Sequence, residues 1–222
     1  MSESINIAID GPAASGKTTV GKIVARELKC RFLDTGTMYR AVAWSAIQNN
    51  IELTDRPSLI SMASLLKIKL VGQGSDEKLL VDGIDITEQT KNEQVDNTVS
   101  VVAMISGVRR ELVCQQRRIA SDGPIVMAGR DIGTVVLPEA EIKIYLEASV
   151  KLRAVRRYRE LLSKGSNVDL ALVQADLQRR DEIDQSRSDS PLKPSPESVL
   201  IHTDSLNIQS VAEKILLLAS RY

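Results

Sequence analysis

The sequence predicts an α/β fold in which a mainly parallel sheet is covered by helices on both faces. The first observation is an apolar, strand-like run at residues 5–10 that passes through a glycine-containing loop into helical spacing over 16–28. The second is that strand-like and helix-like patterns keep alternating along most of the chain. The third is a strand pattern at 199–202 followed by apolar residues in 3.6-residue register over 208–219. Parallel strands need crossover helices between them, so the alternation favours a parallel sheet.

Further elements are expected at regular intervals between these two ends. Strand patterns cover 31–34, 124–128 and 142–146, and helical patterns cover 35–49, 91–121 with a break near Ser106, 149–163 and 168–180. Residues 61–87 differ, because Ile68 and Leu70 alternate with lysines and Asp82-Gly83 is a strong turn signal between two short apolar runs. We therefore expect a small β-rich insertion within one domain.

The composition describes a folded enzyme or binding protein. Of the 222 residues, 43% are apolar and 26% are charged, which excludes a disordered chain and is enough for one domain with a substantial core. Lys and Arg number 29, as do Asp and Glu, and only 3% of the residues are aromatic. Zero net charge and few aromatic rings disfavour a nucleic-acid binder or a protein of anionic membranes. Because no signal-peptide pattern or long apolar run is present, we expect a cytoplasmic protein.

The most specific motif is Gly-Pro-Ala-Ala-Ser-Gly-Lys-Thr at residues 11–18, which matches GxxxxGK[ST] without a gap. It lies between a predicted strand and a predicted helix, as a phosphate-binding loop must. Backbone N–H groups and the helix dipole would surround phosphate oxygens, Lys17 would reach the β- and γ-phosphates, and the Thr18 hydroxyl would bind Mg²⁺. The sequence therefore predicts a P-loop NTPase-type core that binds a nucleoside triphosphate with Mg²⁺.

Three classes of protein use such a loop: GTPase switches, ATPase motors and kinases of small acceptors. No NKxD string for guanine recognition is present, and the chain is small for a motor. A kinase needs a second anion site, and arginine suits phosphate because its planar group can donate two hydrogen bonds at once. Arg130 is the clearest candidate, because Gly129 and Gly133 bracket it just after a predicted strand, where α/β sheets bind ligands.

The basic helix expected at 149–163 has two interpretations that the sequence leaves open. It carries Arg153, Arg156 and Arg157 among apolar positions, as an ordinary amphipathic helix would. Alternatively it is a lid that closes over the phosphates, excludes water and brings arginines to the transferring group.

Five linked motifs resemble those of bacterial cytidylate kinases, in the same order along nearly the whole chain. They lie at residues 7–19, 34–40, 81–87, 129–134 and 180–187. The resemblance implies a nucleoside monophosphate kinase of pyrimidine metabolism, which transfers phosphate from ATP to CMP or dCMP and yields ADP with CDP or dCDP. It also implies one domain over 1–222, with a core at 1–60, 91–148 and 166–222, a monophosphate-binding insertion at 61–90 and a lid at 149–165.

The resemblance further implies three groups of site residues, with ATP and Mg²⁺ as donor and cofactor and with a monomeric chain. The ATP-binding group is Gly11, Pro12, Ala13, Ala14, Ser15, Gly16, Lys17, Thr18 and Thr19, with Thr18 as the metal ligand. The CMP-binding group is Thr35, Tyr39, Arg40, Ser100, Arg109, Arg130, Asp131, Arg180, Asp184 and Arg187. The catalytic group is Lys17, Arg130, Arg153, Arg156 and Arg157.

Within the CMP-binding group, the resemblance assigns the base to Ser100, Arg109 and Asp131. The chemistry is consistent, because the amine of cytosine needs acceptors and its O2 and N3 need a donor. Two alternatives stay open: a kinase for another monophosphate such as UMP, and an ATP-binding regulatory module without activity. The role of Asp10 is also open, since it could orient Mg²⁺-bound water or cap the loop.

Overall fold

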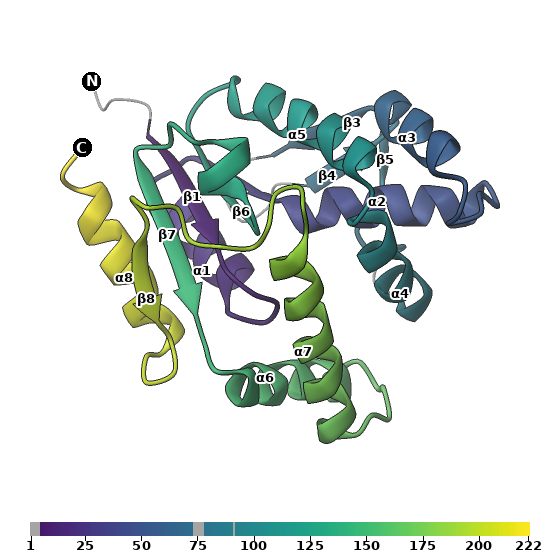
Figure 1. The fold of residues 1–222 in the computed structure, drawn as a ribbon. Helices are drawn as coiled ribbons and strands as arrows, with labels where there is room; N and C mark the ends of the chain where they lie inside the picture. Colours follow the sequence, from purple (N-terminus) through teal and green to yellow (C-terminus); the bar gives the residue numbers. More distant parts are fainter. Residues whose placement is uncertain (1–4, 73–77, 91) are drawn as a thin grey trace.

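The structure is a computed structural model that describes residues 5–72, 78–90 and 92–222 (Figure 1). Predictions for residues 1–4, for 73–77 inside the expected insertion, and for Lys91 at the expected start of a helix lie outside the described residues.

Five parallel strands form the central sheet and confirm the predicted fold class. They are β1 (Asn6–Asp10), β2 (Arg31–Asp34), β6 (Ile125–Gly129), β7 (Ile142–Glu147) and β8 (Val199–His202). Their order is β2-β6-β1-β7-β8, and each neighbouring pair is parallel. All five strands therefore end at the same edge of the sheet, where the loops that follow them lie together.

Helices pack on both faces of this sheet because its strands are apolar on both sides. On one face, Ile7 and Ile9 share a buried cluster with residues of α1 (Lys17–Glu27) and α8 (Ile208–Ala219). On the other, Ala8 belongs to a second cluster. The helices of this second face are α2 (Thr35–Gln48), α3 (Arg56–Leu65), α4 (Glu93–Val102) and α5 (Ser106–Ala120). Successive side chains of β1 thus point alternately into two hydrophobic cores, each of which is covered by helices (Figure 1).

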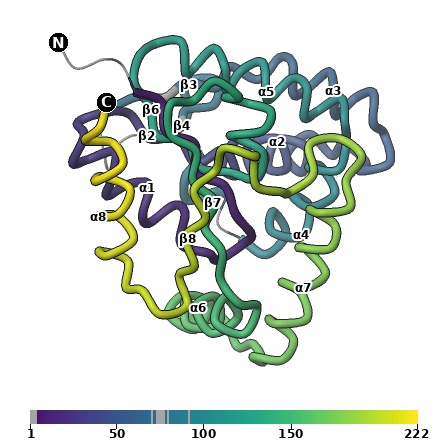
Figure 2. The backbone as a smooth tube through the Cα atoms, turned by 60° about the vertical axis from the view of Figure 1, so that its left-hand side comes forward, coloured from purple at the N-terminus to yellow at the C-terminus, as the bar shows by residue number. Residues whose placement is uncertain are grey.

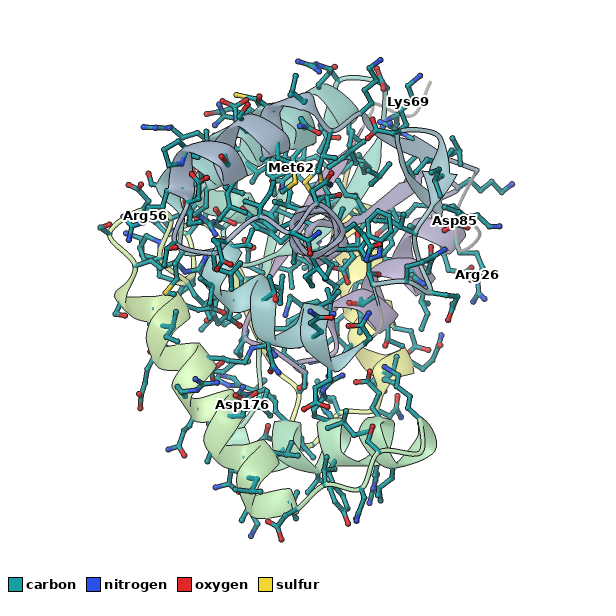
Figure 3. The ribbon with its side chains drawn as sticks, turned by 90° about the vertical axis from the view of Figure 1, so that its right-hand side faces the viewer. Arg26, Arg56, Met62, Lys69, Asp85 and Asp176 are labelled. Atoms are coloured by element: carbon teal, nitrogen blue, oxygen red, sulfur yellow. The ribbon has the colours of Figure 1, made fainter. Side chains whose placement is uncertain are left out.

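The expected insertion contains a second, antiparallel sheet of β3 (Ile68–Val71), β4 (Lys78–Val81) and β5 (Ile84–Asp85). Lys69 and Asp85 mark it in Figure 3, above α7. Asp82 and Gly83 turn the chain between β4 and β5 with φ angles of 51° and 84°, as the Asp-Gly signal predicts.

The first residues of the expected insertion are helical instead, because they belong to α3. The Asp55 carboxylate accepts a hydrogen bond from the Ser58 N–H at 3.1 Å and so caps the helix. Leu59 and Ala63, one helical turn apart, are buried on one face of α3. The sequence patterns missed this short helix because the strand-like alternation at residues 66–70 follows it directly, although its Asp55 cap and the proline in its first turn are typical of a helix start.

The helices α6 (Val150–Ser163) and α7 (Leu170–Ser186) pack against each other through Ala154, Val173 and Leu177. Figure 2 shows α6 below the ends of β7 and β8, with α7 rising from it on the side opposite α8. Helix α7 continues to Ser186, well past the predicted end at residue 180, and therefore carries Asp184 on its last turn.

The sequence patterns also missed a π-helical turn, η2 (Ile132–Val136), that follows β6. Its cap is non-local: the Asp10 carboxylate accepts hydrogen bonds from the backbone N–H groups of Ile132 and Gly133 at 2.8 and 2.7 Å. A cap supplied from more than 100 residues away leaves no signal in the local sequence.

The phosphate-binding loop requires glycine at position 11 for a steric reason. Gly11 has a φ angle of 148°, and a Cβ atom there would lie 2.3 Å from the Leu146 carbonyl oxygen. We expect Gly11→Ala to lower the free energy of unfolding by about 3 kcal/mol, because it adds a backbone clash to an unfavourable φ. Chemical denaturation measures this. The matched control is Gly83→Ala, where φ is 84° and no atom lies within 4 Å of the added Cβ; it should cost roughly 1 kcal/mol. Equal losses would contradict the steric explanation.

Candidate functional site

A cavity of about 710 Å³ lies at the carboxyl-terminal edge of the main sheet. Most of the expected site residues line it: Ala13, Ala14, Ser15, Gly16, Lys17, Thr18, Thr19, Thr35, Tyr39, Arg40, Ser100, Arg109, Arg130, Asp131, Arg156, Arg157, Arg180, Asp184 and Arg187. Gly11, Pro12 and Arg153 are buried but are not among its lining residues. The topology thus brings residues from the two ends of the chain into one cavity.

At one end of the cavity, the phosphate-binding loop leads into α1. Gly16 caps the helix with a φ of 101° and no side-chain hydrogen bond, so the first N–H groups of α1 are available to a ligand. The Lys17 ammonium donates hydrogen bonds to the Pro12 carbonyl at 2.6 Å and to Ser15 Oγ at 3.3 Å. Burial, together with the positive charge of Arg130, lowers the pKa of Lys17 well below its usual value. An anion bound beside this lysine would raise its pKa again and favour its charged form.

Thr18 lies beside Asp34, a residue that the sequence interpretation did not single out. The Thr18 hydroxyl donates a hydrogen bond to Asp34 Oδ2 at 2.5 Å. Hydroxyl and carboxylate oxygens are the donors that Mg²⁺ prefers, so this pair fits that ion next to bound phosphates. Among the described residues, no three His, Cys, Asp or Glu side chains group as a metal site by themselves. Asp34 ends β2 at the edge of the sheet that binds ligands, and that position was the available signal.

Asp10 connects the two sides of the cavity. It ends β1 directly before the phosphate-binding loop, and its carboxylate holds the start of η2, which follows Arg130 and Asp131. Burial raises the pKa of Asp10 to about 6, against the lowering effect of the Gly133 and Ile132 N–H groups. Of the two roles left open for Asp10, the structure contains the capping contacts.

Arginines gather around Asp184 in the middle of the cavity. Asp184 Oδ2 accepts a hydrogen bond from Arg130 Nε at 2.9 Å, and Asp184 Oδ1 pairs with Arg187. Burial opposes ionisation of Asp184, but the charges of Arg130 and Arg187 outweigh it and lower its pKa. Burial and the charge of Arg130 also lower the pKa of Arg180. Positive charge exceeds negative charge here, so the cluster suits a ligand with several negative charges.

The far end of the cavity holds a buried ion pair between Arg109 on α5 and Asp131 after β6. Arg109 Nη2 lies 2.5 Å from Asp131 Oδ2, and its guanidinium lies 5.4 Å above the Tyr39 ring. Ser100 reaches the cavity from α4. The Thr35 hydroxyl donates a hydrogen bond to the Ala128 carbonyl at 3.0 Å. Donors and acceptors are therefore fixed side by side, as recognition of a flat heterocycle requires.

The three arginines of α6 occupy different places. Arg156 donates hydrogen bonds to the Thr203 carbonyl and hydroxyl, both at 3.2 Å, while Arg157 lines the cavity beside Glu160. Arg153 is buried beneath the loop: it pairs with Asp181 at 2.6 Å and donates to the carbonyls of Ala13 and Ala148. Its side chain therefore supports the loop from behind, and in this structure it does not reach the cavity.

A second part of the cavity wall was not predicted from the sequence. It follows β8 and consists of the Thr203, Leu206, Ile208 and Val211 side chains. Its signal was the end of a predicted strand at the ligand-binding edge. The sequence interpretation had no motif to distinguish these apolar residues from ordinary core.

Comparison with protein families gives a match over nearly the whole chain. The sequence model of a family described as "Cytidylate kinase" matches residues 7–221. A protein of Bacillus subtilis named "Cytidylate kinase" is 44% identical over 216 residues, covering 97% of this chain and 96% of that protein. One of Bacillus pumilus with the same name is 45% identical over 221 residues, covering 100% and 98%. One of Streptococcus pneumoniae is 45% identical over 214 residues, covering 96% of each.

Comparison with solved structures supports the fold. An uncharacterised protein of Eubacterium ventriosum aligns with a TM-score of 0.54 at 11% identity, covering 99% of this chain and 100% of that one. A shikimate kinase of Bacteroides thetaiotaomicron aligns with a TM-score of 0.50 at 12% identity, covering 97% and 98%. At such low identity the likeness concerns the fold alone.

The raised pKa of Asp10 predicts a pH-dependent change in stability of the ligand-free protein. The folded protein binds the proton more tightly than the unfolded chain, so Asp10 stabilises the fold fully below pH 4 and loses that contribution as pH rises through 6. Relative to Asp10→Asn, the free energy of unfolding should fall by about 3 kcal/mol in total as the pH rises from about 3 to about 7, mostly between pH 4 and pH 6, and then stay level. Urea denaturation at each pH measures this. Parallel curves for the two proteins would overturn the assignment.

The position of Arg153 predicts a structural rather than a phosphate-contacting role. Arg153→Met should lower the free energy of unfolding by about 3 kcal/mol or more, because it leaves the Asp181 carboxylate buried without its cation. Adding Asp181→Leu should recover much of that loss, as removal of both charges leaves no unpaired ion. The control is Arg159→Met on the exposed side of α6, which should change stability by less than about 0.5 kcal/mol. Similar stability for the Arg153 and Arg159 variants would contradict this role.

Proposed function

This chain belongs to the cytidylate kinase family, and we propose that it transfers the γ-phosphate of ATP to CMP and dCMP, forming CDP or dCDP with ADP. One observation carries the proposal. A single cavity has a phosphate-binding loop at one end, an arginine cluster in the middle and a buried Arg109–Asp131 pair at the other end. That order matches a triphosphate, an acceptor phosphate and a base in a row.

The proposed mechanism depends on alignment and charge. The loop and Lys17 hold the donor phosphates, while Arg40, Arg130 and Arg187 hold the acceptor phosphate, so that one acceptor oxygen faces the γ-phosphorus in line with the leaving oxygen. The new bond joins that acceptor oxygen to the γ-phosphorus, and the bond from the γ-phosphorus to the β–γ bridging oxygen breaks as ADP leaves. No general base is needed, because an ionised phosphate is already a nucleophile.

Surrounding cations stabilise the charge that spreads over the transferring group. Lys17 and Arg130 come from the two sides of the cavity, and Arg156 and Arg157 come from α6. When bound, Mg²⁺ would supply further neutralisation of the phosphate oxygens, with the Thr18 hydroxyl as its protein ligand and Asp34 beside it.

Base selection follows from the Arg109–Asp131 pair. The Asp131 carboxylate and the Ser100 hydroxyl are acceptors for the exocyclic amine of cytosine, and Arg109 is a donor for its ring oxygen and nitrogen. Uracil has an oxygen where cytosine has the amine, so it would place an acceptor against a carboxylate. Leaving such buried groups unpaired costs about 1–3 kcal/mol, which is about fivefold to 150-fold in selectivity.

The proposed organisation is a single domain over residues 1–222. In this organisation the core consists of residues 1–60, 91–148 and 166–222. The monophosphate-binding insertion is residues 61–90, and the lid that closes over the phosphates is residues 149–165. In the part of the chain that the structure describes, no helix is long and apolar enough to cross a membrane. We expect a monomer that acts in the cytoplasm on small nucleotides and binds no nucleic acid or membrane.

The experiment that tests this function is an ADP-release assay with ATP and Mg²⁺ in which CMP, dCMP, UMP, AMP or no acceptor is added. Rapid turnover with CMP and dCMP and slow turnover with UMP and AMP are expected. Preference for another monophosphate would overturn the base assignment but keep the kinase. ATP binding without acceptor-dependent turnover would instead indicate a regulatory module.

The base assignment predicts that Asp131→Ala raises the KM for CMP about 100-fold while changing the KM for ATP by less than about threefold, because only the base loses its acceptor. Steady-state kinetics measure both constants. Since the substitution also leaves Arg109 buried without its partner, Asp131→Asn serves as a second variant that keeps the shape and one acceptor oxygen. Equal losses toward CMP and ATP in both variants would contradict base recognition by Asp131.

A further inference from the structure

One carboxylate outside the expected site residues joins the two sides of the cavity. Asp96, in the first turn of α4, pairs through Oδ1 with Arg40 of α2. Through Oδ2 it accepts a hydrogen bond from Arg157 Nη2 of α6 at 3.1 Å. Arg40 lies on the proposed acceptor side and Arg157 on the proposed lid, so a single side chain connects the two parts.

Among the described residues, Asp96 is the one polar partner that Arg40 and Arg157 share. Arg40 Nη1 donates to the Thr90 carbonyl at 3.1 Å, and Arg157 Nη1 pairs with Glu160 on its own helix at 2.8 Å. Between 20 and 26% of each of the Arg40, Asp96 and Arg157 side chains is exposed. These side chains are buried enough that solvent screens their ion pairs less than it screens fully exposed pairs. Arg40 and Arg157 nevertheless line the cavity, so a ligand there can reach them.

We propose that Asp96 is a positioning residue that occupies Arg40 and Arg157 until an acceptor phosphate displaces it, which couples acceptor binding to release of the lid arginine. The inference rests on the proposed function, because it takes Arg40 as an acceptor-phosphate ligand and Arg157 as a group for the donor phosphates. An incoming phosphate dianion competes for the Arg40 guanidinium and repels the Asp96 carboxylate. Arg157 then becomes free to turn toward the transferring group.

This arrangement protects ATP when no acceptor is bound. In the side reaction, a water oxygen forms a bond to the γ-phosphorus, the bond to the β–γ bridging oxygen breaks, and ADP, phosphate and a proton are released. While Asp96 holds Arg157, the charge stabilisation for that reaction is incomplete. Arrival of the acceptor phosphate supplies the missing arginine at the moment when an acceptor oxygen can replace water.

The test compares Asp96→Asn with the control Glu93→Gln. Both remove one negative charge from the first turn of α4, but among the described residues only Asp96 pairs with both Arg40 and Arg157, while Glu93 is exposed. Loss of the favourable helix-dipole interaction therefore affects both variants equally. We expect Asp96→Asn to tighten CMP binding by about threefold to tenfold in calorimetric titrations, because the competing charge is gone. ATP hydrolysis without acceptor should rise by about threefold or more. Glu93→Gln should change neither quantity.

Two further measurements make the result specific. Combining Arg157→Gln with Asp96→Asn should abolish the rise in hydrolysis, since the released arginine is then missing. Inorganic phosphate, titrated into protein saturated with a non-hydrolysable ATP analogue, should also bind more tightly to Asp96→Asn. This titration is independent of the base, so it still tests Asp96 if CMP turnover by the unmodified protein fails and the proposed function falls.

Two outcomes would overturn the proposal. Weaker binding of CMP and phosphate to Asp96→Asn would mean that Asp96 orients Arg40 for the ligand rather than competing with it. Unchanged binding and unchanged hydrolysis would mean that the ion pairs are ordinary surface contacts without a role in coupling.

Discussion

The contact between the Asp10 carboxylate and the N–H groups of Ile132 and Gly133 joins the two halves of the site. Asp10 ends the central strand and precedes the phosphate-binding loop, and the turn that it holds directly follows Arg130 and Asp131. A buried carboxylate has a substantial desolvation cost, which appears as its raised pKa. The backbone hydrogen bonds offset part of that cost. Through this contact, one strand sets the position of the phosphate-binding loop and that of the segment with Arg130 and Asp131.

The second constraint is the excess of positive charge in the cavity. Lys17, Arg130 and Arg180 lie close enough for burial and mutual repulsion to lower the pKa values of Lys17 and Arg180. Such a cluster destabilises the empty protein and favours any ligand with several negative charges. In the ligand-free protein, the Asp184 carboxylate pairs with Arg130 and Arg187, and the Asp96 carboxylate pairs with Arg40 and Arg157. Binding affinity and a destabilised empty site therefore arise from the same residues.

Much of the fold was predictable because its signals are local. The apolar runs of the five strands, the loop at residues 11–18 and the Asp82-Gly83 turn each depend on a few adjacent residues, and all occur where expected. The missed elements depend on distant partners or on short caps. The turn η2 is capped by Asp10, which ends the neighbouring strand β1 but lies more than 100 residues away in sequence. Helix α3 follows its cap Asp55 in a stretch that strand-like alternation follows.

The sequence by itself determined which kinds of group the site contains: a loop for phosphates and arginines for anions. The resemblance to a kinase family further implied that Arg109 and Asp131 bind the base. Only the tertiary structure decided which of these groups share a cavity and which partners they have. Arg153 and Arg156 are three residues apart on one helix, yet one supports the loop from behind and the other lines the cavity. Asp34 begins one of the motifs without a role assigned to it there, and Asp96 and Thr203 lie outside every motif. The reason is physical: a residue's type fixes what it can bind, but its burial and its neighbours fix what it does bind, and both come from chain segments far away in sequence.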